Sequence, residues 1–145
     1  MISRRTMLLA PLALIACGSA AAAQTIEVMK TPTCGCCTHW VDHLRAEGFE
    51  VSVTDLPDLT AVARELHVPD DLRSCHTARI GGYAVEGHVP AADIRRLLAE
   101  RPDAAGIAAP GMPIGSPGME QGDVREPHQV ILFTRDGRRS LFAQH

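Results

Sequence analysis

Three of the chain's five cysteines fall within four consecutive positions, in the stretch TPTCGCCTHW at residues 31–40. Cys34 and Cys37 have the C-x-x-C spacing of a dithiol exchange motif. Cys36 adds a third thiol, which offers competing disulfides and interferes with a simple exchange cycle. The same three thiolates, spread over one helical turn, can instead bind one or several soft metal ions. The pattern therefore indicates either metal binding or disulfide exchange.

The local sequence places these thiols at the start of a helix. Pro32 and Thr33 interrupt an alternating strand, and the following pattern predicts a helix that begins at Thr33 or Cys34 and ends at Ala46. The positive end of a helix lowers the pKa of a nearby thiol and favours the thiolate. Cys37 also lies on the apolar face of this helix, so it could serve simply as a small buried hydrophobic residue.

A fourth thiol, Cys75, occurs in RSCHTA, directly before a predicted strand. In an α/β sandwich of this element order, the loop that enters that strand lies against the start of the first helix. We therefore expect Cys75 to face Cys34 and Cys37. Thioredoxin-like exchange enzymes have a cis-proline at this location, whereas Ser74-Cys75-His76-Thr77 contains no proline. This difference favours metal ligands over a substrate-docking surface.

The histidines differ in how well they are placed to join the cysteines. His88 follows a predicted hairpin and precedes a helix, at the same rim as the thiols, and is a candidate ligand. Whether His43 is a ligand is left open by its position on the helix, and His39 is expected on a solvated helical face. His76 adjoins Cys75, and adjacent residues in an extended segment point to opposite sides, so we expect only one of the two to reach the site. The other histidines show no convergence with the cysteines: His67, His128 and His145.

Residues 102–120 are rich in proline and glycine and contain a repeated motif, in which Pro-Gly-Met ends at Met112 and again at Met119. Loops of this length in a small domain are usually functional or disordered, and the two methionines favour an ordered lid. Thioether, thiolate and imidazole together form a soft ligand set that selects Cu(I). Zinc sites rarely use methionine, so zinc fits this set less well.

The remaining pattern predicts one α/β domain over residues 24–145, with a small mixed sheet and helices on both faces. Apolar alternation, turn residues and helix stop signals define its elements. The expected strands cover residues 25–30 and 49–56, the expected helices begin at Asp58 and Pro90, and the expected hairpins cover residues 77–87 and 128–144, with turns at Gly81-Gly82 and Asp136-Gly137.

Residues 1–23 have the layout of a secretory signal: two arginines, a short apolar run and an alanine-rich end. The arginine pair resembles a twin-arginine export signal, which leaves the choice between that route and the general one open. LIAC at residues 14–17 resembles a lipobox, in which case Cys17 would carry a lipid anchor. Either outcome predicts a periplasmic location. The net charge of −3 provides no basic surface for nucleic acid.

Three segments resemble the exported, thioredoxin-like copper-resistance CopG proteins: TPTCGCCTHWVDHLRAEGF, SCHTARIGGYAVEGHVPAADIRRLLAERP and PGMPIGSPGME. The resemblance runs from about Met29 to Glu120. It implies a thioredoxin-like fold and a cysteine-held copper centre of one or several ions. It also implies periplasmic copper handling together with other copper-handling proteins. The matching positions are Cys34, Cys36, Cys37 and Cys75, with His43, His76, His88, Met112 and Met119 in the same segments.

We therefore hypothesise a copper-binding protein with ligands Cys34, Cys36, Cys37, Cys75, His88, Met112 and Met119. The alternative is a thiol–disulfide oxidoreductase of the thioredoxin-like type. A third hypothesis is an enzyme that interconverts Cu(I) and Cu(II) with a cysteine pair as its electron store. That enzyme would need the same ligands as passive copper storage. Zinc storage is a weaker fourth hypothesis, because zinc would leave the methionine loop unexplained.

Overall fold

The computed structural model describes residues 24–145 and shows a mixed α/β protein. The helical elements are α1 (Gly35–Ala46), α2 (Thr60–Glu65), the short η1 (Asp70–Leu72) and α3 (Ala91–Glu100). The strands are β1 (Ile26–Lys30), β2 (Val51–Asp55), β3 (His76–Ile80), β4 (Tyr83–Gly87), β5 (Gly106–Ala109), β6 (Gln129–Phe133) and β7 (Arg139–Gln144).

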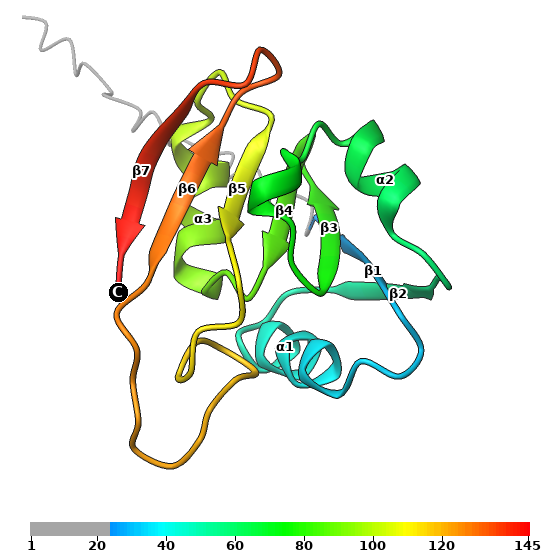
Figure 1. Cartoon of the computed structure of the whole chain (residues 1–145), viewed down its shortest axis with the longest axis vertical. Helices are drawn as coiled ribbons and strands as arrows, with labels where there is room; N and C mark the ends of the chain where they lie inside the picture. Colours follow the sequence, from blue (N-terminus) through cyan, green and yellow to red (C-terminus); the bar gives the residue numbers. More distant parts are fainter. Residues whose placement is uncertain (1–23) are drawn as a thin grey trace, which may run out of the picture.

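All seven strands belong to one sheet, in the order β2-β1-β3-β4-β5-β6-β7 (Figure 1). β1 pairs with β2 in parallel, and β4 pairs with β5 in parallel. The other neighbours are antiparallel. The expected mixed sheet is therefore present, and the C-terminal hairpin of β6 and β7 extends it because β6 pairs with β5.

Helices cover both faces of this sheet. The larger apolar cluster joins Trp40, Val41 and Leu44 of α1 and the apolar side of α3 to one face. The smaller cluster lies on the other face, where Ala63 of α2 and the segment after it pack on the strands. Among residues 24–145, none of the helices has the length and apolar character required to cross a membrane.

The β3–β4 hairpin has the expected turn. Gly81 and Gly82 both have positive φ values, of 58° and 88°, which a two-residue turn of this type requires and which glycine adopts readily. The resulting register pairs Thr77 with Glu86 and Ile80 with Tyr83. The two ends of the hairpin, at Cys75 and His88, are thereby brought to the same edge of the sheet.

The expectation of an uninterrupted loop over 102–120 was wrong for residues 106–109, which form β5 in the middle of the sheet. This strand is made of Gly-Ile-Ala-Ala, and every residue in it is buried. A Cβ on Gly106 would lie 2.2 Å from the Ala84 carbonyl oxygen, so glycine is needed for this close approach. Small residues buried on both faces produce no polar alternation, which explains why the pattern indicated a loop.

Candidate metal centre

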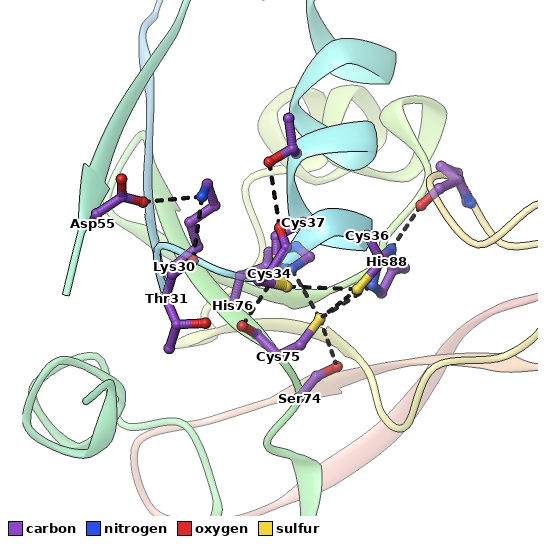
Figure 2. Close-up of a disulfide and its surroundings, with 12 residues drawn as sticks. Lys30, Thr31, Cys34, Cys36, Cys37, Asp55, Ser74, Cys75, His76 and His88 are labelled. Carbon is purple, nitrogen blue, oxygen red and sulfur yellow. Dashed lines mark hydrogen bonds and ion pairs between the residues drawn. A yellow bond between two sulfur atoms is a disulfide. The ribbon is translucent and has the colours of Figure 1, made fainter. Parts of the chain in front are cut away.

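The four sulfur atoms lie together where the start of α1 meets the segment before β3 (Figure 2). Cys34 and Cys37 form a disulfide, whereas Cys36 and Cys75 are free thiols and half-buried. The Sγ atom of Cys36 lies 3.5 Å from Sγ of Cys34 and 3.8 Å from Sγ of Cys75. The sulfur of Cys37 is fully buried and lies 3.3 Å from the backbone oxygen of Cys75. Cys75 was expected to face Cys34 and Cys37, and the four sulfur atoms all lie within 4.8 Å of one another.

The chain positions the cysteine triplet by a short turn after β1. The backbone N–H of Cys34 donates to the oxygen of Thr31, and Cys34 itself is the residue that precedes the first turn of α1. Its side chain makes no capping hydrogen bond, and the first turn of the helix contains no acidic residue. The positive end of the helix therefore faces the thiols without a competing side-chain cap or acidic residue.

A buried carboxyl group holds the segment that carries Cys75. The N–H of Ser74 and the hydroxyl of Thr77 each donate a hydrogen bond to the carboxyl group of Glu86, and both donor–acceptor distances are 2.7 Å. Glu86 is 1% exposed, and burial raises its pKa to about 7, against the lowering effect of its hydrogen bonds to Thr77 and Ser74. From the neighbouring strand, Glu86 thus holds the backbone of Ser74 before Cys75 and the side chain of Thr77 after it.

His88 contacts the thiol cluster directly, as Figure 2 shows. Its Nε2 atom lies 3.1 Å from Sγ of Cys75, and its Nδ1 atom lies 2.8 Å from the backbone oxygen of Pro117. A carbonyl oxygen only accepts, so Nδ1 carries the proton and Nε2 presents a lone pair to the sulfur. Metal-binding histidines commonly have this arrangement, in which the second nitrogen is held by a carbonyl group.

His76 also reaches the site, contrary to the expectation that only one of Cys75 and His76 would. Cys75 lies in a bend before the strand begins, so the alternation of a regular strand does not apply to the pair. The Nδ1 atom of His76 lies 3.3 Å from Sγ of Cys75, and its ring packs 4.3 Å from the Trp40 ring. Burial lowers the pKa of His76 to about 3, and its Nε2 atom has no hydrogen-bond partner. His76 is therefore a neutral imidazole in the wall of the site.

The electrostatic surroundings of Cys75 favour its protonated form. Burial raises the pKa of its thiol to about 12, and the adjacent Cys36 thiol acts in the same direction. Burial also lowers the pKa of His88, which keeps that imidazole neutral. A soft cation can replace the thiol proton, because thiolate and neutral imidazole are the forms that bind metals.

The loop between β5 and β6 packs over the start of α1 (Figure 1). Gly118 lies so close to the helix that a Cβ would stand 2.8 Å from the Cys36 oxygen. The hydroxyl of Ser74 donates a hydrogen bond of 2.7 Å to the backbone oxygen of Gly111. This bond connects the start of the loop to the site. Met119, next to Gly118, is half-buried, whereas Met112 is 53% exposed. The loop thus packs against the helix start that carries the cysteines.

The remaining histidines of the motif segments do not join the thiols. Among residues 24–145, compact groups of potential metal ligands consist of the four cysteines and of Cys75 with His76 and His88. His39 is exposed, as expected, and His43 is half-buried outside both groups.

Sequence reasoning missed Glu86 and the backbone groups of the loop that contact the site. Glu86 lies in a strand whose residues are all buried, and a lone acidic residue in such a strand is the signal that could have identified it. The oxygen of Pro117 carries no signal in the sequence, because any residue has a backbone carbonyl. Glu120 also lies near enough to His88 to raise its pKa, against the larger effect of burial.

Comparison with known proteins found a family model and two solved structures that are similar to this chain. A family described as "Protein of unknown function, DUF411" matches residues 72–119. A solved structure titled "Copper resistance protein copG- Form 2" is 49% identical, with a TM-score of 0.80, over 84% of this chain and 98% of that one. Its Form 1 is 50% identical, with a TM-score of 0.80, over 83% and 96%. Among curated proteins none matches significantly.

The identity and the coverage place the chain in a family. It belongs to the family of the copper resistance protein CopG.

Proposed function

We propose that this protein binds copper as Cu(I) through the thiolates of Cys34, Cys36, Cys37 and Cys75 and the imidazole of His88. The relatives are named for copper resistance, and the cysteine cluster supports a metal-binding function. The observation that carries the proposal is the position of Cys75. Its sulfur contacts both the thiol of Cys36, at 3.8 Å, and Nε2 of His88, at 3.1 Å. Thiolate sulfur and imidazole nitrogen form a donor set that suits Cu(I).

We further propose that the centre holds more than one copper ion. Two compact donor groups overlap at Cys75: the four cysteines form one, and Cys75, His76 and His88 form the other. A thiolate can bridge two metal ions, so Cys75 is placed to serve both groups. His76 contributes a buried neutral imidazole to the second group, with an Nε2 atom that has no partner.

The disulfide supports a redox role in copper handling. Oxidation of the thiols of Cys34 and Cys37 to a disulfide releases two electrons and two protons, and the electrons would reduce two Cu(II) ions to Cu(I). A small dithiol reductant would then return the pair to thiols by exchange. Cys36, whose sulfur lies 3.5 Å from that of Cys34, is placed to take part in this exchange.

The methionine loop would complete and cover this centre. Met119 follows Gly118, which packs on α1, and is the better placed thioether donor, whereas Met112 needs a movement of the loop to turn inward.

Zinc is the competing metal, since four cysteines satisfy a tetrahedral zinc site. Substitution of Met112 and Met119 by leucine should weaken Cu(I) binding and leave Zn²⁺ binding unchanged.

The test is a Cu(I) titration of the reduced protein against a chromogenic Cu(I) chelator, without oxygen. We expect one or more equivalents to be bound, and the Cys36→Ser/Cys75→Ser variant to lose at least one of them. Ser52→Ala/Thr54→Ala, which removes two exposed hydroxyls from β2, is the matched control and should bind normally. Equal binding by the cysteine variant would refute the proposal.

A second function, thiol–disulfide exchange, is favoured by the Cys34–Cys37 disulfide at the start of α1. Metal-free protein would then reduce or oxidise a model disulfide substrate catalytically. Catalytic turnover of the disulfide substrate by metal-free protein, unchanged when Cu(I) is added, would favour this function. Stoichiometric reaction without turnover would favour copper binding.

We propose a periplasmic location, with other copper-handling proteins of that compartment as partners. We also propose that the fold is of the thioredoxin-like type, since β1-α1-β2 is followed by the β3–β4 hairpin and α3. The signal at residues 1–23 and the lipid-anchor candidate Cys17 lie outside the described residues. The intact mass of exported protein distinguishes a chain that starts at Gln24 from one that starts at a lipidated Cys17.

A further inference from the structure

A cavity of about 340 Å³ lies between α2, η1 and the turn that joins β6 to β7. Three arginines line it: Arg64, Arg73 and Arg135. The cavity lies on the face of the sheet that carries α2, whereas α1 packs on the other face. Its lining residues are separate from the two donor groups around the thiols. A volume of this size is in the range of small-molecule binding sites.

Most arginines of this protein pair with a carboxylate, but these three do not. Among residues 24–145, the arginines with no carboxylate oxygen within 4.0 Å are Arg64, Arg73, Arg101, Arg125 and Arg135. Three of these five therefore line the same cavity. Like charges repel, so their concentration around one hollow favours an anion as the ligand.

The acidic residues around the cavity are mainly paired elsewhere. Asp71 accepts from the guanidinium group of Arg139, with a donor–acceptor distance of 2.7 Å, and Asp136 accepts from that of Arg138, at 2.8 Å. The carboxylate in the lining is that of Asp70. Three arginines and one aspartate, with the histidine counted as neutral, give the lining a net charge of +2.

Arg73 is held in place before any ligand binds. It is half-buried, and its guanidinium group donates a hydrogen bond of 3.3 Å to the hydroxyl oxygen of Thr60. Asp58, which accepts two hydrogen bonds from Thr60 at the start of α2, partly balances the charge of Arg73. Arg64 and Arg135 are exposed, so their guanidinium groups are free to turn toward a ligand.

The two walls of the cavity are fixed relative to each other by apolar packing. Val68 and Leu72, which come after α2 in the chain, share the smaller apolar cluster with Phe133. Phe133 is followed directly by Thr134 and Arg135 of the opposite wall. The protein core thereby keeps the arginines of both walls at one cavity.

His67 ends α2 with a positive φ of 58° and also lines the cavity. Glycine is the usual residue in this conformation at the end of a helix, because a Cβ is strained there. The protein therefore has an imidazole beside the arginines at a cost in backbone strain, as residues of ligand sites often do.

We propose that this cavity binds a phosphate group, as free phosphate or as the end of a phosphate monoester, through Arg64, Arg73 and Arg135. A guanidinium group presents two parallel N–H donors that fit two phosphate oxygens. A phosphate monoester carries a charge of about −1.5 to −2 at pH 7, which matches the charge of the lining. A carboxylate would leave part of that charge unbalanced. This site does not depend on the function proposed for the thiols.

The test is a calorimetric titration of the purified protein with inorganic phosphate at low ionic strength, where screening is weak. We expect saturable binding of one phosphate, which Arg64→Gln and Arg135→Gln each weaken about tenfold. Arg101→Gln removes another exposed arginine without an ion pair and should bind phosphate like the wild type. No saturable binding by the wild type, or equal affinities of all three variants, would overturn the proposal.

Vesicles distinguish a soluble phosphate from a lipid headgroup. Phosphatidic acid carries a phosphate monoester, so phosphatidylcholine vesicles with and without it are the probes. Sedimentation of the protein with the phosphatidic acid vesicles, reduced in Arg64→Gln, would assign the site to a headgroup. Binding of inorganic phosphate without sedimentation would assign it to soluble phosphate or a soluble monoester.

A measurement without variants covers the case in which a substitution prevents folding. Addition of inorganic phosphate should shift the backbone amide NMR signals of Arg135, Gly137 and His67, which line the cavity. The largest shifts at Gly35 and Cys36 would instead place the anion at the start of α1 and would overturn the proposal.

Discussion

The Nε2 atom of His88 lies 3.1 Å from the Sγ atom of Cys75, although thirteen positions separate the two residues in the chain. The β3–β4 hairpin produces this contact. Cys75 directly precedes β3, His88 directly follows β4, and the two-residue turn at Gly81-Gly82 sets the register that brings them together. Because side chains alternate along a strand, a shift of register by one residue would separate this pair.

Substitution of His88 should weaken Cu(I) binding without preventing it. His88→Asn removes the imidazole lone pair but leaves the four cysteines, so we expect the Cu(I) affinity to fall about 10- to 100-fold, the range seen for groups that support a metal site. His39→Asn, on the exposed side of α1, is the control. Competition with a Cu(I) chelator measures both, and equal affinities would show that His88 is not a ligand.

A methyl group at Gly118 should lift the loop from α1. Gly118 has a φ of +85°, and a Cβ there would lie 2.7 Å from the backbone nitrogen of Trp40 and 2.8 Å from the backbone oxygen of Cys36. Gly122, with a φ of +56° and no atom near its Cβ position, is the matched control. Both alanine variants pay about 1 kcal/mol for the left-handed backbone.

Only Gly118→Ala should also expose the site. We expect a lower melting temperature than for Gly122→Ala and faster alkylation of Cys36. Identical alkylation rates in the two variants would mean that the loop does not cover the cysteines.

Glu86 should make the stability of the metal-free protein depend on pH. Its pKa is about 7 in the folded protein against an ordinary value of 4.5, because burial disfavours the carboxylate. The folded state therefore binds more protons between these values. The free energy of unfolding should fall as the pH rises from 4.5 to 7, by up to about 3 kcal/mol.

The Glu86→Gln variant should flatten this decline, because its neutral amide does not titrate. Glu65→Gln, at an exposed position, should keep the wild-type slope. Urea unfolding across the pH range provides the measurement, and a wild-type slope in Glu86→Gln would contradict the assignment.

Trp40 should contribute more to the free energy of unfolding than Tyr83, another aromatic residue that donates one hydrogen bond to a backbone oxygen. The Trp40 ring is fully buried, its Nε1–H donates to the Val89 oxygen over 2.9 Å, and it packs on His76. Trp40→Phe loses volume and leaves that carbonyl unpaired, at a cost of about 2–4 kcal/mol. Tyr83→Phe removes only a hydroxyl that donates to the Pro102 oxygen over 2.9 Å, at a cost of about 1 kcal/mol. Denaturant unfolding should give this order, and the reverse order would contradict it.

The parts of the fold that depend on local signals could be predicted from the sequence. The Pro-Thr turn before Cys34 predicted the start of α1, and Gly81-Gly82 predicted the β3–β4 hairpin. The element order placed Cys75 at the start of α1, where its sulfur lies 3.8 Å from that of Cys36. These predictions needed only turn chemistry, hydrophobic periodicity and the usual geometry of a mixed sheet.

The rest depends on tertiary contacts that leave no local pattern. β5 was taken for loop because its small residues are buried on both faces. Only one of Cys75 and His76 was expected to reach the site, but the bend at Cys75 turns both side chains to it. The contact of His128 with His145 arises from strand pairing over a distance that periodicity does not detect.

The central claim is that the thiolates at the start of α1 and the thiolate of Cys75, directly before β3, bind copper together. X-ray absorption at the copper edge of the reduced, Cu(I)-loaded chain measures the ligands of the metal directly. The account predicts a first shell dominated by sulfur, with a nitrogen contribution that falls in His88→Asn and a sulfur contribution that falls in Cys75→Ser. A first shell of nitrogen and oxygen alone, or one that Cys75→Ser leaves unaltered, would contradict it.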